Sequence, residues 1–451
     1  MKKKTIQLLF IVPLLLAFVS CKKYLDLRPD KKLTVPASLA DLQALLDNKN
    51  VMNYNSPNYD IFSSDEYIAN DAIYQGFSLN QRKAWVWENF EYLYPNDWAK
   101  TYDPVYYCNV VLTQLEDIDR TQANAKAWDN VKGSALVFRS MCYLRALWIF
   151  SKTYDAATAA TDFGIALRTS SDFNQPVSRA SVADCYQTVI DELMTAASIL
   201  PENPVHPMRP SKAGAYGFLS RAYLSMRMYD SAFKYADLCL GIKSDLLDYN
   251  STNINSTRPF GSTLNIEVIL NQRVGVSYYG GGPELFVDSS IYQSLEVDDL
   301  RKRVCFRPVA DGYQFKGTYS GSFGSQFTGI ATDEMYLVRA ECNARNGYTT
   351  EALADLNTLL DKRFVTGTFV EVTASSPEEV LERVLLERKR ELFSRGLRWM
   401  DIKRLNREGA GIIPNRTVDG VSYSLQPNEN RYALPLPTDI INLTGMPQNP
   451  L

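Results

Sequence analysis

The sequence is poor in the residues and motifs on which most catalytic sites rely. It contains one histidine, His206, which lies in the proline-rich segment Pro204-Val205-His206-Pro207. A Ser-His-Asp, Cys-His or histidine-rich zinc site would need that single imidazole, and a loop histidine between prolines is a poor general base. The chain also lacks G-x-S-x-G, G-x-G-x-x-G and G-x-x-x-x-G-K-[ST] motifs. We therefore expect no enzyme of these classes, and no bound metal or cofactor.

An excess of charge of either sign is also missing. The 451 residues include 48 basic and 51 acidic ones, for a net charge of -3. Such a balance gives no electrostatic reason to expect nucleic acid or an anionic membrane face as a partner. The basic stretch 387–391 begins and ends with glutamate, which is typical of a charged helix face. We therefore expect no nucleic-acid partner.

Closely spaced cysteines are absent as well. Six cysteines lie beyond residue 100 and no two form a C-x-x-C pair: Cys108, Cys142, Cys185, Cys239, Cys305 and Cys342. That spacing disfavours a zinc site, although an even number in an exported protein leaves disulfide pairing open. Most of the six lie in apolar helical patterns, which favours buried free thiols.

The first residues have the pattern of an export signal. A basic cluster, Lys2-Lys3-Lys4, precedes an apolar run, Leu8 to Val19, that is shorter than the about 20 residues needed to cross a bilayer. Cys21 follows Phe18-Val19-Ser20, which resembles the cleavage box of bacterial lipoproteins. We predict a lipoprotein signal peptide over residues 1–20, an acylated Cys21 and a tether over 21–37. The alternative is a plain secretory signal followed by an accidental cysteine.

Helical periodicity dominates the body, which we assign to residues 38–451. Apolar residues recur at spacings of three and four from Val131 to Ile149. Six further positions match a tetratricopeptide helix pair: Tyr216, Leu219, Ser220, Tyr223, Ala232 and Ala236. Residues 337–340 echo residues 219–222 and are followed by Ala352 after a turn two residues longer. The patterns predict a mostly α fold with a tetratricopeptide-like helix-pair scaffold.

Two segments interrupt this periodicity. A large insertion at about 250–332 is rich in Gly, Ser, Asn and Tyr, and residues 54–98 alternate Tyr and Trp with Asn and Asp. Such composition predicts loops with short strands, and long irregular segments in a compact protein usually carry function. We therefore expect the ligand region within them.

The aromatic residues of these segments are the candidate ligand-binding residues. They are Trp85, Trp87, Tyr92 and Tyr94 in the first segment and Tyr278, Tyr279, Tyr313, Phe315 and Tyr319 in the second. Aromatic rings stack on the C–H face of a sugar while Asn, Asp and Gln bind its hydroxyls, so the composition suits a neutral saccharide. The alternative is core packing. Trp98, Tyr102 and Tyr106, spaced at i, i+4 and i+8, are expected to include a packed helix face.

Paired carboxylates leave a glycosidase as a third hypothesis. Asp65-Glu66 and Asp298-Asp299 could supply its two acids. The competing interpretation is that these groups are solvated or paired with arginines such as Arg301 and Arg303. We favour the second interpretation, and no catalytic residue is assigned.

Several stretches, in order from one end of the chain to the other, resemble the SusD/RagB family of Bacteroidetes outer-membrane lipoproteins. They are Cys21-Lys22-Lys23-Tyr24-Leu25-Asp26 with Pro29; Trp98 to Asn109 with Tyr102 between; Met335 to Glu341 with Ala352, Leu356 and Asn357; Glu387-Arg388 through Glu391-Leu392; Gly396 to Asp401; and Leu434-Pro435-Leu436-Pro437 with Gln448-Asn449-Pro450.

The resemblance implies a fold of four tetratricopeptide-like pairs that serves as a hinged lid over a SusC-like TonB-dependent transporter. Such a lid is lipid-anchored to the outer membrane, faces the exterior, needs no cofactor and performs no covalent chemistry. It captures an oligosaccharide or, in the RagB branch, a peptide. The resemblance also implies that Glu387, Arg388, Glu391, Arg398 and Asp401 hold the C-terminal helices together through paired charges.

Overall fold

The computed structural model describes residues 36–261, 264–274, 285–321 and 324–450. The chain divides into a unit of residues Met1–Ser38 and a compact unit of Leu39–Leu451. The predicted signal peptide and Cys21 lie outside the described residues. None of the described helices combines the length and apolar character needed to cross a membrane.

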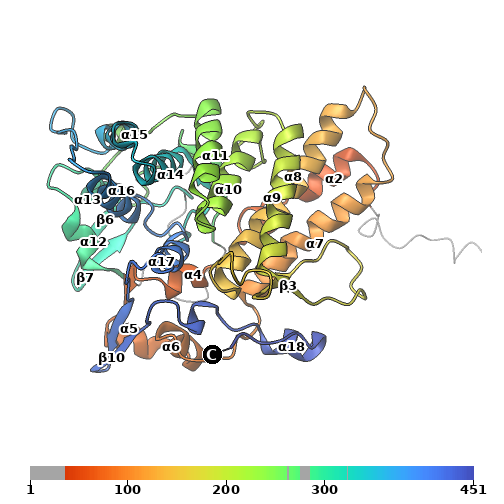
Figure 1. Ribbon diagram of the computed structural model, residues 1–451, viewed down its shortest axis with the longest axis horizontal. Coiled ribbons are helices and arrows are strands. Elements are labelled where there is room, and N and C mark those ends of the chain that lie inside the picture. Colours follow the sequence, from red (N-terminus) through yellow and green to blue (C-terminus); the bar gives the residue numbers. More distant parts are fainter. Residues whose placement is uncertain (1–35, 262–263, 275–284, 322–323, 451) are drawn as a thin grey trace, which may run out of the picture. The chain divides into compact units, whose positions relative to one another are not determined.

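A row of helices forms the scaffold of the compact unit (Figure 1). In chain order the row contains α7 (Asp97–Leu115), α8 (Ala125–Phe150), α9 (Val182–Ile199), α10 (Lys212–Ser225), α11 (Tyr229–Ile242), α14 (Thr332–Arg345), α15 (Thr349–Asp361) and α16 (Pro377–Glu391). Consecutive members pack against each other, and α2 (Leu39–Leu46) covers α7 and α8. The predicted mostly α, helix-pair scaffold is therefore confirmed.

Local sequence explains where these helices begin and which are central. Ser181, Ser211 and Ser376 each accept a hydrogen bond from the backbone three residues on, which caps α9, α10 and α16. Pro377 takes the first position of α16, where its missing N–H costs nothing. Helix α8 is buried almost all round from Val131 onward, because α7 and α9 flank it.

The two predicted repeat pairs are the helix hairpins α10–α11 and α14–α15. The turns that join them, 226–228 and 346–348, have the same length. The expectation of a longer second turn is therefore wrong, because it aligned Leu337 with Leu219. In the structure Arg339 takes the place of Leu219, and Ala352 takes that of Ala232.

The described part of the predicted insertion contains loops and short strands, as expected, and also short helices. The strands of the compact unit form antiparallel pairs: β1 (Tyr67–Ile68) with β5 (Phe286–Val287), β2 (Phe163–Ala166) with β3 (Arg179–Ser181), β4 (Val268–Leu270) with β8 (Ile330–Ala331), β6 (Phe306–Val309) with β7 (Gly312–Phe315), and β9 (Asn415–Val418) with β10 (Val421–Ser424). Short helices complete the unit: α3 (Lys49–Met52), α4 (Tyr59–Ser63), α5 (Asp71–Gly76), α6 (Leu79–Trp85), α12 (Ser289–Ser294), α13 (Arg301–Val304), α17 (Arg398–Asn406) and α18 (Thr438–Thr444).

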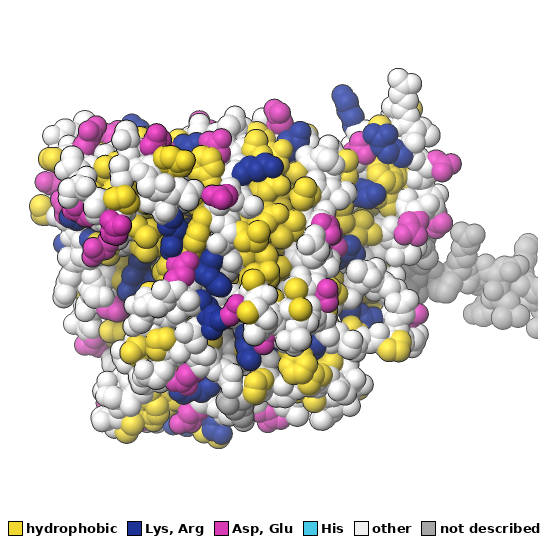
Figure 2. All heavy atoms as spheres, viewed as in Figure 1, with side chains coloured by type: hydrophobic (Ala, Val, Ile, Leu, Met, Phe, Trp, Pro, Cys, Tyr) yellow, Lys and Arg dark blue, Asp and Glu magenta, His cyan; other side chains and the backbone are white. Residues whose placement is uncertain are grey.

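Apolar side chains gather over the middle of the row, where α9, α10 and α11 lie, on the face shown in Figure 2. Lysine and arginine side chains are interspersed with aspartate and glutamate on the same face.

Beneath the surface, the six cysteines from Cys108 to Cys342 are buried and free, which confirms the preference for thiols over disulfides.

Buried ion pairs join the C-terminal helices to the rest of the scaffold. Arg404 of α17 binds Glu341 of α14 with both terminal nitrogens, at 2.6 and 2.7 Å, and its Nε donates to Asp401. Arg388 of α16 also donates to Asp401, at 2.8 Å. The role that the resemblance implies, holding the C-terminal helices together, is thus confirmed for the signature residues Arg388 and Asp401. Three other signature residues pair outside the C-terminal helices: Glu387 and Glu391 with Arg301, and Arg398 with Asp65.

Candidate functional site

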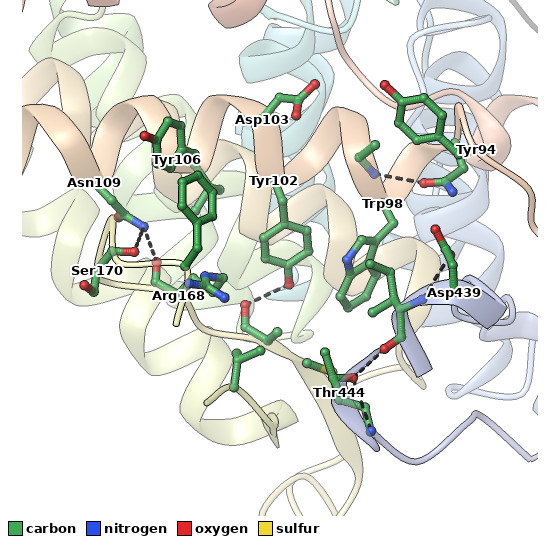
Figure 3. Close-up of a pocket in the computed structure, with 18 of the residues that line it drawn as sticks. Tyr94, Trp98, Tyr102, Asp103, Tyr106, Asn109, Arg168, Ser170, Asp439 and Thr444 are labelled. Carbon is green, nitrogen blue, oxygen red and sulfur yellow. Dashed lines mark hydrogen bonds between the residues drawn. The ribbon is translucent and has the colours of Figure 1, made fainter. Parts of the chain in front are cut away.

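A cleft of about 460 Å³ lies along α7 (Figure 3). Its three walls are α7 with the residues just before it, the segment 166–177, and the C-terminal segment 439–446. The lining residues are Tyr94, Asn96, Trp98, Ala99, Tyr102, Asp103, Val105, Tyr106, Tyr107, Asn109, Ala166, Arg168, Ser170, Phe173, Val177, Asp439, Ile440, Thr444 and Met446. Aromatic and apolar side chains dominate this lining, and a few polar groups are interspersed.

The aromatic stripe of α7 contributes most of the apolar surface. Trp98 is buried, and its ring packs edge-on against Phe150 with the centroids 5.3 Å apart. Tyr106 is 36% exposed and stacks on Phe173, itself 73% exposed, with the centroids 4.8 Å apart and the planes 24° apart. The stripe therefore packs at its Trp98 end, as expected, and offers ring surface to a ligand at its Tyr106 end.

Hydrogen bonds fix the second wall to α7. The Tyr102 hydroxyl donates to the carbonyl of Ala166 at 2.7 Å, and the Asn109 amide donates to the carbonyls of Arg168 and Ser170 at 2.8 and 3.2 Å. Figure 3 shows these bonds running from α7 to the segment below it. Because three of its carbonyl groups and its aromatic residue Phe173 are held by side chains of the same helix, this wall is preorganised.

The third wall is the C-terminal segment that contains α18. Gln448 fastens its base, because the side-chain oxygen accepts from the Leu436 backbone N–H and the amide donates to the Leu436 carbonyl, at 2.8 and 2.9 Å. The Asn449 amide donates to the carbonyls of Phe150 and Leu434. Helix α18 has no fully buried residue, but its Ile440 and Ile441 are half-buried and pack against the hydrophobic core.

The C-terminal end of α8 anchors two of the three walls directly. The Phe150 carbonyl accepts from Arg179 Nη2 at 3.0 Å and from Asn449 Nδ2 at 2.8 Å. Lys403 of α17 donates to the carbonyls of Trp148 and Ser151 at 2.8 and 2.6 Å. Cations and donors at the end of a helix satisfy carbonyl groups that have no partner within the helix. Burial lowers the pKa of the Lys403 ammonium to about 7.

The charged groups of the cleft are few. Asp103 lies on α7 and Asp439 at the start of α18, and both are exposed. Partial burial raises the pKa of the Asp103 carboxyl above its ordinary value. Arg168 is half-buried, and its Nη2 donates to the Asp172 carbonyl at 2.7 Å. The cleft can thus accept and donate hydrogen bonds around an apolar floor, which suits a ligand with hydroxyl groups and apolar faces.

The predicted aromatic residues are dispersed in the structure. Tyr94 lines the cleft and is 73% exposed. Trp85, Trp87, Tyr92 and Tyr319 are buried instead. For these four the interpretation as ligand platforms is corrected, because their rings present no face to solvent.

Trp85 and Trp87 do act as stacking platforms, but for a residue of the same chain. The Arg416 guanidinium carbon lies 3.5 Å from the ring centroid of Trp85 and 4.5 Å from that of Trp87. Its Nη2 also donates to the carbonyls of Phe62 and Ser64. The buried guanidinium thus fixes the β9–β10 hairpin to α4 and α6 through cation–π contacts and carbonyl hydrogen bonds.

The remaining candidates of the insertion lie apart from the cleft. Tyr313 is half-buried and stacks on Tyr292 with the ring centroids 3.7 Å apart. Phe315 packs against Phe393. Neither residue lines the cleft, and Tyr278 and Tyr279 lie outside the described residues.

Two of the carboxylates nominated for a glycosidase, Asp65 and Asp299, form ion pairs in the structure. Asp299 is buried against Arg301 at 2.5 Å, as the competing interpretation predicted. Burial alone would raise the pKa of Asp65, but Arg398 at 2.7 Å and Lys389 at 3.4 Å hold it below its ordinary value. His206 is exposed, and its ring accepts a hydrogen bond from the Met208 backbone.

Glu267, Asp333 and Glu391 form a carboxylate cluster with the geometry of a metal site, because their oxygen atoms lie within 4.8 Å of one another. Arginines already neutralise them. Arg363 binds Glu267 and Glu391 at 2.9 and 2.8 Å, and Arg395 binds Asp333 at 2.6 Å. The donor set therefore suits an ion-pair network better than a metal ion.

Sequence reasoning missed two walls of the cleft. Phe173 lies in the polar stretch 170–176, where a single aromatic residue among Ser, Asp, Asn, Gln and Pro is itself a signal of exposure. Asp439 and Met446 gave no such signal, because nothing in their local pattern indicates that the C-terminal segment lies beside α7.

Two family models match the chain in the same order as the motifs. Residues 23–224 match a model described as starch-binding and associating with the outer membrane, and residues 325–451 match the model of the SusD family. The chain belongs to the SusD family. The second matched segment contains α16 and α17, and therefore the signature charges that form the buried ion pairs.

Relatives and solved structures agree with SusD membership. SusD-like protein P2 of Formosa agariphila is 24% identical over 340 residues, which cover 61% of this chain and 66% of that relative. The matched region is thus just under two thirds of the length of the curated relative.

Solved structures of the SusD superfamily share the fold. A SusD superfamily protein from Bacteroides thetaiotaomicron superposes with a TM-score of 0.73 at 19% identity, covering 92% of this chain and 100% of that one. A SusD-like carbohydrate binding protein from Bacteroides vulgatus gives 0.67 at 20%, covering 90% and 96%. A laminarin binding SusD-like protein gives 0.65 at 17%, covering 91% and 98%.

Proposed function

We propose that this SusD-family protein binds an oligosaccharide in the α7 cleft and delivers it to a SusC-like TonB-dependent transporter of the outer membrane. The observation that carries the proposal is the exposed stack of Tyr106 and Phe173, with Tyr94 as a further exposed ring of the same cleft. The exposed surface of these rings is available for stacking, and the C–H face of a sugar ring can stack on it. Membership of a family described as starch-binding supports this ligand class.

Binding, without bond cleavage, is the role that the cleft supports. Its lining is mainly aromatic and apolar, and Asp103 and Asp439 are its acidic side chains. The absence of enzymatic activity stays a prediction, and turnover of fluorogenic glycosides would contradict it. A peptide remains the second ligand class, as the RagB resemblance implies. Saturable binding of peptides together with failure of all saccharides would replace the first proposal by this one.

Removing both exposed rings is expected to weaken saccharide binding. The variant Tyr106→Ala/Phe173→Ala should raise the dissociation constant for a bound oligosaccharide at least about tenfold, because stacking and apolar contact are lost together. Calorimetry with neutral oligosaccharides from α- and β-glucans, mannan and xylan measures this constant. Tyr348→Ala is the control, since Tyr348 is 57% exposed, directly precedes α15 and does not line the cleft. Equal affinities of the two variants would exclude the cleft as the site.

Lipid anchoring at Cys21 is part of the proposal and has its own test. The variant Cys21→Ser is expected to move most of the protein from the membrane fraction to the soluble fraction, because the acyl chains supply the membrane affinity. Lys23→Ser is the control, because it changes a neighbouring residue and leaves the thiol in place. Fractionation followed by immunoblotting measures the distribution. Unchanged membrane association of Cys21→Ser would contradict anchoring through this residue.

A further inference from the structure

We infer that the cleft prefers uncharged saccharides over anionic ones, and that Asp103 and Asp439 set this preference. The inference rests on the proposed function and narrows its ligand class. Asp103 comes from α7 and Asp439 from the start of α18, so two of the walls each contribute an acidic residue to the lining (Figure 3).

The charge balance of the lining is negative. Asp103, Asp439 and Arg168 are the charged side chains among the lining residues. Within the described part of the chain, neither aspartate forms an ion pair with a lysine or arginine, in contrast to the paired Asp65, Asp299 and Asp401. Their charges therefore act on whatever occupies the cleft.

Arg168 does not offset both carboxylates. Its Nη2 already donates to the Asp172 carbonyl at 2.7 Å, which braces the turn that carries Phe173. Its own backbone carbonyl accepts from the Asn109 amide at 2.8 Å. The guanidinium therefore belongs to the framework of the second wall and supplies one positive charge against two negative ones.

The same carboxylates suit a neutral sugar. An ionised carboxylate accepts hydrogen bonds at two oxygens and so can bind neighbouring hydroxyl groups. A sugar that carries its own carboxylate or sulfate would meet repulsion from both walls, in surroundings less polar than bulk water because of the aromatic floor. Attraction to hydroxyl groups and repulsion of anions therefore come from the same two residues.

The test compares each glucan or mannan oligosaccharide of the panel with the same chain whose primary hydroxyls have been oxidised to carboxylates. For the wild type we expect calorimetry to show binding of the neutral form and at least about tenfold weaker binding of the oxidised form. In Asp103→Asn/Asp439→Asn the ratio of the two dissociation constants should fall to about threefold or less. In wild type it should also shrink in 0.5 M salt, because exposed charges are screened.

Asp311→Asn is the matched control, because Asp311 is an exposed aspartate in the turn between β6 and β7. It should keep the wild-type ratio. Equal or tighter binding of the oxidised form, or an unchanged ratio in the double variant, overturns this inference alone, provided that Tyr106→Ala/Phe173→Ala still weakens neutral binding at least about tenfold. If no neutral saccharide binds the wild type, the proposed function fails and this preference with it.

Discussion

Replacing Arg404 with alanine is expected to lower the free energy of unfolding by roughly 3–5 kcal/mol. Arg404 is fully buried and binds Glu341 with two terminal nitrogens and Asp401 with the third. Without the guanidinium, the carboxylates of Glu341 and Asp401 stay buried but lose a positively charged partner. The free-energy cost of removing them from water is then only partly offset.

Urea denaturation at pH 7 measures this loss. Arg383→Ala is the control, because Arg383 is an exposed arginine of α16 and such surface substitutions usually change stability by no more than about 0.5 kcal/mol. The loss of stability in Arg404→Lys should lie between those of the two alanine variants. The lysine ammonium restores the positive charge but cannot donate the paired hydrogen bonds of a planar guanidinium. A loss in Arg404→Ala no greater than that in Arg383→Ala would show that the buried network contributes little to the stacking of the C-terminal helices.

Replacing Glu66 with glutamine is expected to change how stability depends on pH. Burial raises the pKa of the Glu66 carboxyl to about 8, the Ser394 backbone N–H opposes this shift, and the neighbouring Asp65 charge adds to it. Between the ordinary pKa and about 8, the folded protein keeps a proton that the unfolded chain releases. Stability therefore falls as the pH rises through that interval, by about 1.4 kcal/mol per unit from this group.

Glutamine has the same shape, can still accept from Ser394 and does not titrate. The stability of Glu66→Gln relative to wild type should thus rise by roughly 3–4 kcal/mol between pH 5 and pH 8. Denaturation curves at pH 5, 6.5 and 8 provide the comparison. Glu371→Gln, which changes an exposed carboxylate, should follow the wild type. Parallel pH profiles for Glu66→Gln and wild type would contradict a protonated Glu66 in the folded state.

The scaffold could be predicted from sequence because its signals are local. The spacing of Tyr216, Leu219 and Tyr223 indicates one helix face, so pattern and structure agree there. The expectation of a longer second turn is wrong because it rests on the similarity of residues 337–340 to residues 219–222. The helix boundaries give the correct alignment of the two pairs.

The site was predicted only in part because burial and neighbourhood are not local properties. Trp85 and Tyr94 have similar sequence surroundings, yet the first is buried beneath Arg416 and the second is exposed in the cleft. Whether an aromatic ring meets solvent depends on a residue more than 300 positions away in the chain. For the same reason, no sequence pattern predicted that Asp103 and Asp439 line the same cleft.

The last turn of α8 gives the cleft a common point of reference. Arg179 from beside the second wall and Asn449 from the base of the third share the Phe150 carbonyl, while the Phe150 ring supports Trp98 of the first. Because residues of or next to all three walls share this attachment, the walls are expected to keep their spacing when the body moves as a unit. A ligand held there can therefore move with the whole body and need not be released.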